Sequence, residues 1–283
     1  MKPRSLAARR GADRAVQAAS TLAAFLALAA LGWILSEVMR RGAGALTYDF
    51  FTRLPTPPGL AGGGLANALV GTLLITLLAT VLGVPVGMLA GIYLGEFGRA
   101  HRFAGVVRFL SNLLMGTPSI IVGVFVYTLV VVPAGGFSGY AGAMALAVIM
   151  LPVVARTTED MLGLVPNALR EAALALGAPR WKVTLGVVFR AAKAGLVTGV
   201  LLAVARVSGE TAPLLFTALN SPYWMRSLGE PTANLTVTIF NYAMSPYADW
   251  KAMAWGASLL ITAGVLALAV LSRFLFHEPT GEH

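Results

Sequence analysis

The chain has 283 residues, of which 57% are hydrophobic and only 12% are charged, and its formal net charge is +9. A soluble domain carries about a quarter charged residues, so this composition excludes an ordinary soluble globule and indicates an integral membrane protein. The absence of cysteine excludes disulfides, thiol catalysis and thiolate metal sites.

Six apolar windows are long enough to cross about 30 Å of hydrocarbon. They cover residues 17–36, 66–94, 106–132, 138–156, 194–218 and 252–272. We therefore predict an all-α polytopic membrane protein with six transmembrane helices. Small residues in the second window, such as Gly83 and Gly87, predict close packing against a neighbouring helix.

The basic residues predict the orientation of these helices. Most of the 21 Lys and Arg residues lie in the N-terminal segment and in the loops after the second and fourth windows. The positive-inside rule then places both termini in the cytoplasm, and it explains the net charge without a nucleic-acid partner. A cleaved signal peptide is the alternative for the first window, but that window is long for one, and its loss would leave an odd number of spans.

The third window contains two residues that interrupt helices, Gly116 and Pro118. Interrupted helices line the transport pathway in many transporters, although a simple kink has the same sequence pattern. We predict a helix break or gate at these residues.

A polar segment at 159–193 separates the fourth and fifth windows. Pro166 suits the first turn of a helix, and Gly177 suits a left-handed stop at its end. Four apolar residues share one face of this predicted helix: Val165, Leu169, Ala172 and Leu176. We expect a short amphipathic helix just outside the membrane whose apolar face docks on another protein.

The fifth window carries two charges, Arg206 and Glu210, spaced four residues apart so that they can pair on a helix. Intramembrane charges are costly and usually functional, so we assign Arg206, Glu210 and the adjacent Thr211 to an anion pathway. A self-neutralising pair that only fixes the helix orientation is the alternative. Pro213 is expected to bend the helix just beyond the pair.

The loop at 219–251 is rich in aromatic residues and contains a short apolar run from Leu235 to Tyr242. We expect this run to form a short helix that lies on the outer surface or dips into it. Anchoring at the membrane interface and docking of an outside partner are both open for this loop.

Enzymatic chemistry finds no support in the sequence. The three histidines, His101, His277 and His283, lie near polar ends with no carboxylates at metal-ligand spacing, and the chain has no phosphate-binding P-loop. We expect no catalytic residue, no metal site and no directly bound cofactor.

Several segments resemble a known family. Glu171, Ala172, Ala173 and Gly177 resemble the EAA signature of ABC-importer permeases. Three stretches are similar to phosphate-importer permeases of the PstA type: GTPSIIVGVFVY at 116–127, LPVVARTTEDML at 151–162 and ARVSGETAPLLFTALNSP at 205–222. The resemblance covers about residues 65–272.

This resemblance implies a type I ABC-importer permease bundle in a bacterial-type inner membrane, forming half of a phosphate pathway. The implied partners are a homologous PstC-like permease, two PstB-like ATPase subunits that use the ATP, an external PstS-like phosphate-binding protein and the lipid bilayer. The implied ATPase-docking residues are Glu171, Ala172, Ala173, Leu176 and Gly177.

The implied organisation is a basic cytoplasmic N-terminus (1–16), a first helix with its external loop (17–64), a permease core (65–276) that includes the EAA coupling loop (159–193), and a cytoplasmic tail (277–283).

The chain departs from the family pattern at Phe189–Arg190 and Lys193–Ala194, where Leu-Pro pairs are common. Without these prolines, we expect a more continuous helix into the fifth span. A permease for sulfate, molybdate or another oxyanion is the nearest alternative function. A stand-alone secondary transporter or channel is more distant, because neither would need a docking helix.

Overall fold

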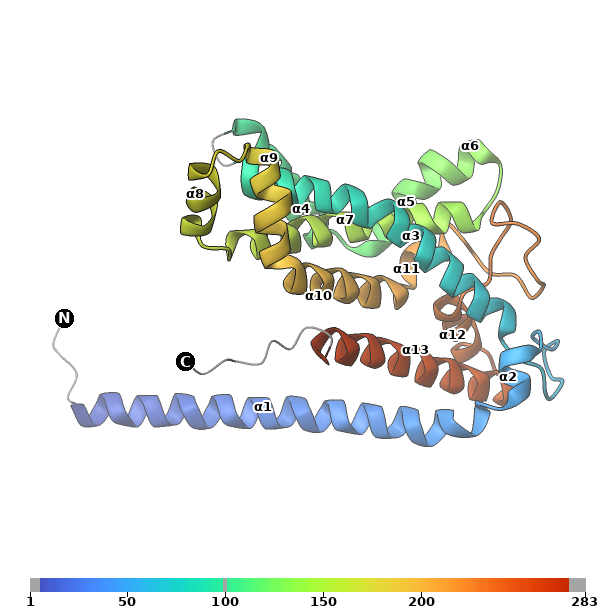
Figure 1. Ribbon diagram of the computed structural model, residues 1–283. Helices are drawn as coiled ribbons and strands as arrows, with labels where there is room; N and C mark the ends of the chain where they lie inside the picture. Colours follow the sequence, from blue (N-terminus) through green and yellow to red (C-terminus); the bar gives the residue numbers. More distant parts are fainter. Residues whose placement is uncertain (1–5, 99–100, 275–283) are drawn as a thin grey trace.

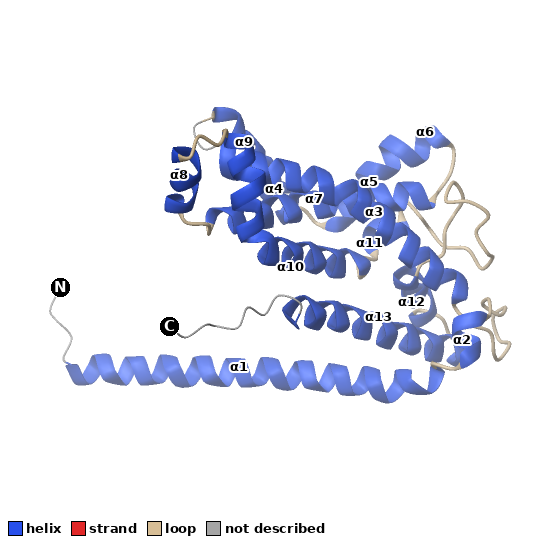
Figure 2. Ribbon diagram, viewed as in Figure 1, coloured by secondary structure: helices blue, strands red, loops and turns tan. Residues whose placement is uncertain are grey.

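The computed structural model describes residues 6–98 and 101–274, which form helices joined by loops, without a strand (Figure 2). This confirms the all-α prediction, while the tail 277–283 lies outside the described residues. The α-helices are α1 (Leu6–Gly42), α2 (Tyr48–Thr52), α3 (Ala66–Ile92), α4 (Arg102–Gly116), α5 (Ser119–Val126), α6 (Val132–Ala134), α7 (Gly139–Gly163), α8 (Asn167–Ala175), α9 (Arg180–Val183), α10 (Phe189–Ser208), α11 (Ala212–Leu215), α12 (Leu235–Ala243) and α13 (Ala248–Phe274). Shorter segments are the 3-10 turn η1 (Ala43–Ala45) and the π-helical segments η2 (Tyr93–Phe97), η3 (Tyr127–Val131) and η4 (Thr184–Val188).

The helical bundle has two distinct ends (Figure 1). The N-terminal part of α1, the C-terminal part of α13 and helix α8 lie at one end, which we call the α8 end. Helices α2 and α6 lie at the opposite end, which we call the α2 end. The first and last long helices therefore direct the two termini toward the end that carries α8.

Five helical segments are long and apolar enough to cross a membrane. They are Arg10–Ala45, Ala66–Phe97, Gly139–Gly163, Arg180–Ser208 and Ala248–Ser272. Each overlaps one of the predicted windows, and α7 continues beyond the predicted window to Gly163, inside the segment assigned to the coupling loop.

The third predicted window is a broken span. Its two halves, α4 and the run from α5 to α6, meet at an angle of 105°. The second span ends near Glu96, which is bonded to Arg170 of α8, whereas the fourth begins at Gly139, whose N–H bonds to the loop carbonyl of Glu230. The segment between them therefore joins the two ends of the bundle, and counting this bent pair as one span gives six candidate spans, in agreement with the prediction.

The fifth span begins and ends earlier than predicted. It runs without interruption from Arg180 to Ser208, through α9, the π-helical segment η4 and α10. The predicted continuity is confirmed, because no proline breaks the helix at Phe189–Arg190 or Lys193–Ala194. The predicted extension to residue 218 is wrong, since Gly209 ends α10 and a separate short helix, α11, follows.

Helices α3 and α7 form the tightest pair in the core. A Cβ at Gly87 would lie 2.9 Å from the carbonyl oxygen of Leu151, and one at Gly91 only 2.5 Å from that of Ala155. Side chains at these positions would push the two helices apart. This confirms that the small residues of the second span serve close packing.

Helix α12, the short helix predicted in the 219–251 loop, is present. It packs against α13 and α3, and Leu235, Val237 and Tyr242 are buried. Of the two placements left open by the sequence, the structure shows a helix inserted into the bundle rather than one lying on its surface.

Candidate functional site

A small polar cavity of about 110 Å³ lies where two helix interruptions meet. Its lining includes residues from the α4–α5 connection, from α7 and from the end of α10. They include Thr117 and Ser119, Ile149 and Val153, and Arg206 and Glu210. The two regions singled out in the sequence, which are far apart along the chain, therefore face one cavity.

Pro118 accounts for the first interruption. Helix α4 ends with a bond from the Thr117 N–H to the Leu114 carbonyl oxygen at 3.2 Å, and Thr117 then adopts an extended conformation. Proline has no N–H and disfavours a helical residue before it, so α4 stops there. A Cβ at Gly116 would meet nothing within 4 Å, so close packing does not require that glycine.

The second interruption follows Ser208. The N–H groups of Gly209 and Glu210 bond to the carbonyl oxygens of Arg206 and Val207, which tightens the last turn of α10. Pro213 lies in the first turn of α11, where its missing N–H costs nothing. The expectation of a proline bend within a continuing helix is therefore wrong, because the helix ends before it reaches the proline.

The two interruptions are packed against each other. A Cβ at Gly123 of α5 would lie 2.6 Å from the Cα of Pro213. This close contact fixes the position of α5, just beyond the first break, relative to α11, just beyond the second. The cavity walls are therefore set by backbone-to-backbone contact.

Arg206 and Glu210 do not form the predicted ion pair. Arg206 lies in the last turn of α10, but Glu210 lies beyond the helix end, so the expected spacing of one helical turn is lost. Within the described residues, neither the guanidinium nor the carboxylate has a hydrogen-bond or ion-pair partner. Thr211, which the sequence grouped with them, does not line the cavity.

Helix α12 supports the backbone beside this cavity. The Thr236 hydroxyl lies 2.8 Å from the Glu210 carbonyl oxygen. Asn234 is 1% exposed and caps α12, because its Oδ1 accepts the Val237 N–H at 2.9 Å. Its Nδ2 donates to the Leu219 carbonyl oxygen at 3.2 Å, so one side chain ties α12 to the loop after α11.

Helix α8, at the α8 end of the bundle, has the predicted left-handed stop. Gly177 has a φ of +82°. Its N–H bonds to the Leu174 carbonyl oxygen at 2.9 Å, and the Ala178 N–H bonds to the Ala173 carbonyl oxygen at 3.3 Å. These two bonds form a Schellman motif, which satisfies the carbonyl groups at the end of the helix.

The predicted apolar face of α8 is divided. Val165 is buried and Ala173 packs beside it against the helical bundle, whereas Leu169 is exposed and Leu176 is 90% exposed. The prediction that Val165 shares an outward docking face with Leu169 and Leu176 is wrong, because Val165 precedes the helix and packs inward. Glu171 and Ala172 are exposed.

Comparisons with known proteins identify the family. The model for the binding-protein-dependent transport system inner membrane component matches residues 83–277. The phosphate transport system permease protein PstA of Yersinia pestis is 49% identical over 244 residues, which cover 86% of this chain and 83% of that protein. The chain belongs to this family, among the PstA-type permeases.

Further comparisons agree with this assignment to the PstA-type permeases. PstA of Haemophilus influenzae is 49% identical over 259 residues, or 92% of each chain. A solved chain of the bacterial alginate ABC transporter, in complex with alginate pentasaccharide-bound periplasmic protein, has a TM-score of 0.65 and covers 95% of both chains. At 14% identity, that structure shows the shared fold alone.

In this PstA-type permease, the cavity and its support contain residues that the sequence did not single out. Thr117 and Ser119 flank Pro118, and hydroxyl residues beside a proline in an apolar span could have indicated a polar lining. Asn234 directly before an apolar run is a recognisable helix cap. The residues described in the structure contain no group of three or more side chains that could hold a metal ion.

Proposed function

We propose that this PstA-type permease transports phosphate and that the cavity beside Arg206 is a site on the transport pathway. The observation that carries the proposal is the convergence of two broken helices on an unpaired arginine within a chain of this family. A guanidinium offers a planar fork of donors that matches two oxygens of an oxyanion. The curated relatives whose names specify phosphate support the choice of anion.

Glu210 gives a chemical reason to prefer phosphate over sulfate. Phosphate near neutral pH still carries protons, so it can donate a hydrogen bond to a carboxylate, whereas sulfate has no proton to donate and would be repelled. The same negative charge limits how tightly phosphate binds, which favours its release. The hydroxyl groups of Thr117 and Ser119 lie in the same lining.

The proposal extends to partners and orientation. Helix α8 presents Glu171, Ala172 and Leu176 to a cytoplasmic ATPase of the PstB type, which binds and hydrolyses the ATP. Because the ends of α1 and α13 lie at the α8 end, both termini are then cytoplasmic (Figure 1). A PstC-like permease supplies the other half of the pathway, and a PstS-like protein delivers phosphate at the α2 end.

The test is uptake of radiolabelled phosphate by proteoliposomes that contain the assembled importer. Replacing Arg206→Gln removes the fork of charged donors, so we expect uptake to fall about 10- to 100-fold, the equivalent of about one charge-assisted hydrogen bond. Arg190→Gln, an exposed arginine on the same helix, is the matched control and should retain uptake. Normal uptake by the Arg206 variant would contradict the role of the cavity.

Competition experiments identify the cargo. Unlabelled phosphate should block uptake of the label, whereas sulfate and molybdate should not. Effective competition by sulfate would instead support the general-oxyanion alternative. Under that alternative, Glu210→Gln should not change the preference of the importer between phosphate and sulfate.

A further inference from the structure

Two arginines from different helices form hydrogen bonds to the same short π-helical segment at the α8 end. Arg170 belongs to the docking helix α8, and Arg108 belongs to α4, the helix that leads to the break at Pro118. Both reach η2, the last turn of the second span. Segment η2 therefore lies between the docking helix and one wall of the cavity.

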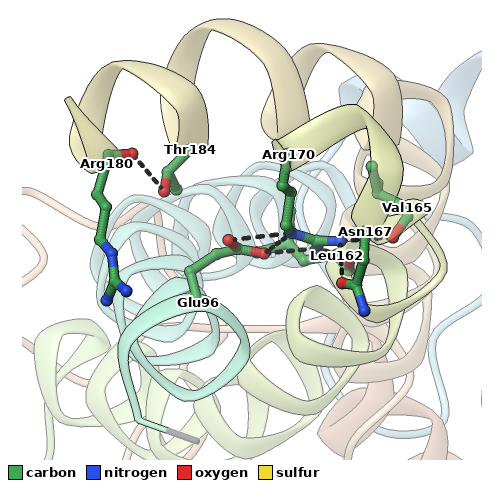
Figure 3. A network of polar contacts seen from close by, with 7 residues as sticks. All are labelled: Glu96, Leu162, Val165, Asn167, Arg170, Arg180 and Thr184. Atoms are coloured by element: carbon green, nitrogen blue, oxygen red, sulfur yellow. Dashed lines mark hydrogen bonds and ion pairs between the residues drawn. The ribbon is translucent and has the colours of Figure 1, made fainter. Parts of the chain in front are cut away.

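All three nitrogen atoms of the Arg170 guanidinium donate hydrogen bonds at this end of the bundle. Its Nε and Nη2 donate to the Glu96 carboxylate, with a shortest distance of 2.6 Å, and the two side chains are only 12% and 9% exposed (Figure 3). Nη2 also donates to the Leu162 carbonyl oxygen at 2.7 Å, and Nη1 donates to the Val165 carbonyl oxygen at 2.5 Å. One side chain thus joins α8, the end of α7 and η2.

The second contact continues from η2 to α4. Nη2 of Arg108 donates to the Leu94 carbonyl oxygen at 2.9 Å, and Nε donates to Oε1 of Glu159 at 2.6 Å. Leu94 lies in the same π-helical segment as Glu96, and Glu159 lies on α7. The two arginines therefore bind the same short segment.

These contacts resist independent movement of the parts that they join. Separating a nearly buried, bidentate arginine–carboxylate pair leaves two charges without partners in a poorly solvated place. Moving α8 away from η2 is therefore more costly than moving the two together. Arg108 holds α4 to η2 by a charge-assisted bond to the Leu94 carbonyl oxygen, and to α7 by its pair with Glu159, so a displacement of α8 and η2 carries α4 with it.

The opposite wall of the cavity has a covalent connection to α8. Helix α8 leads through Gly177 into the continuous helical segment Arg180–Ser208, which carries Arg206 in its last turn. The docking helix is thus connected to Arg206 by the chain itself and to Thr117, at the end of α4, through Arg170, η2 and Arg108.

We propose that the Arg170–Glu96 pair and the bond from Arg108 to the Leu94 carbonyl oxygen, joined through η2, transmit the movement of the docking helix to the α4 wall of the cavity, so that both walls move in one step. Arg170, Glu96 and Arg108 are positioning residues that contact neither the anion nor the ATPase. This inference rests on the proposed function, because it concerns how ATP hydrolysis is coupled to opening of the same cavity.

The test measures anion transported per ATP hydrolysed in the reconstituted importer. Glu96→Gln and Arg170→Gln should each retain ATP hydrolysis while this ratio falls roughly 3- to 30-fold, the range of measured coupling effects. Arg180→Gln is the matched control, because Arg180 lies beside Glu96 at the same end and its guanidinium has no bond in the described structure (Figure 3). It should keep the wild-type ratio.

A cross-linking experiment separates transmission from simple structural support. The chain has no cysteine, so Glu96→Cys with Arg170→Cys introduces a unique pair. The reduced double variant should hydrolyse ATP with a lowered transport ratio, and a short bifunctional thiol reagent should restore that ratio. Failure of the cross-link to restore it would overturn transmission through this contact.

The outcome is distinguishable from failure of the proposed function. If the wild-type importer moves a different anion, the transport ratio is measured with that anion and the inference is still tested. If both single variants assemble normally and keep the wild-type ratio, the inference is wrong, while the role of Arg206 stands or falls on its own variant.

Discussion

The α8 end and the central cavity use the same residue type in opposite ways. Arg170 at the α8 end donates to a carboxylate and to backbone carbonyl groups, and it is nearly buried. Arg206 at the cavity is exposed and has no partner within the described part of the chain. An arginine whose donors are all used holds protein segments together, whereas one whose donors are free can bind a ligand.

The largest effect is expected from a substitution at Gly177, which ends helix α8 at the α8 end. Gly177→Val forces a β-branched residue into a left-handed conformation, which costs about 1–2 kcal/mol even for an unbranched side chain, so the end of α8 should unravel. We expect transport per ATP to fall about tenfold or more, since 1.4 kcal/mol corresponds to a factor of ten.

Gly177→Asn is the matched control, because asparagine tolerates the left-handed conformation. It should retain most of the coupling, as measured by the same ratio of phosphate to ATP. Equal coupling in the Val and Asn variants would show that the conformation of this residue does not matter, and the docking helix would then not need a fixed end.

A smaller effect is expected at the support of the cavity. Asn234→Ala removes the cap of α12 and the bond to Leu219, at a cost of about 1–2 kcal/mol, so the thermal midpoint should fall by a few degrees. Uptake should fall only a few-fold, because Arg206 itself remains. The measurements are thermal unfolding in detergent and initial uptake rates.

Asn241→Ala is the control on the same helix, since no bond of its side chain occurs within the described structure. Its unfolding midpoint should match that of the wild type. An unchanged unfolding midpoint in the Asn234 variant would contradict the inference that α12 supports the cavity.

The smallest effect is expected from Gly116→Ala, which serves as the comparison for a change at the neighbouring Pro118. A Cβ at Gly116 meets open space and the residue is helical, so Gly116→Ala should change stability by less than about 0.5 kcal/mol and leave uptake intact. Pro118→Ala permits the helix to continue past Thr117 and should lower uptake several-fold. If the glycine variant alone lost activity, the break would depend on flexibility and not on the missing N–H of proline.

Much of the fold was predictable because its causes are local. Long apolar windows predicted the positions of the spans, Pro118 predicted the first break, and Gly177 predicted the end of α8. Each of these features depends on residues within about one helical turn. The short helix α8 and the break in the third span were therefore predicted without tertiary information.

The predictions that failed depended on contacts with other elements. Arg206 and Glu210 were expected to pair on one helix, but the chain leaves the helix after Ser208, and α11 then packs against Gly123. Val165 was expected to face outward with Leu169, but a buried cluster with Ala173 holds it inward. Periodicity identifies an apolar face, but it does not identify which part of that face the rest of the chain covers.

The sequence by itself determined that this protein is a helical permease with a short helix between its fourth and fifth spans and an arginine in its fifth span. These properties follow from hydrophobic length, proline and glycine chemistry, and the cost of charge in a membrane. Only the tertiary structure decided which arginine is occupied and which is free. Arg170 meets Glu96 across 74 residues of sequence, and a contact of that separation is created by folding and has no local signature.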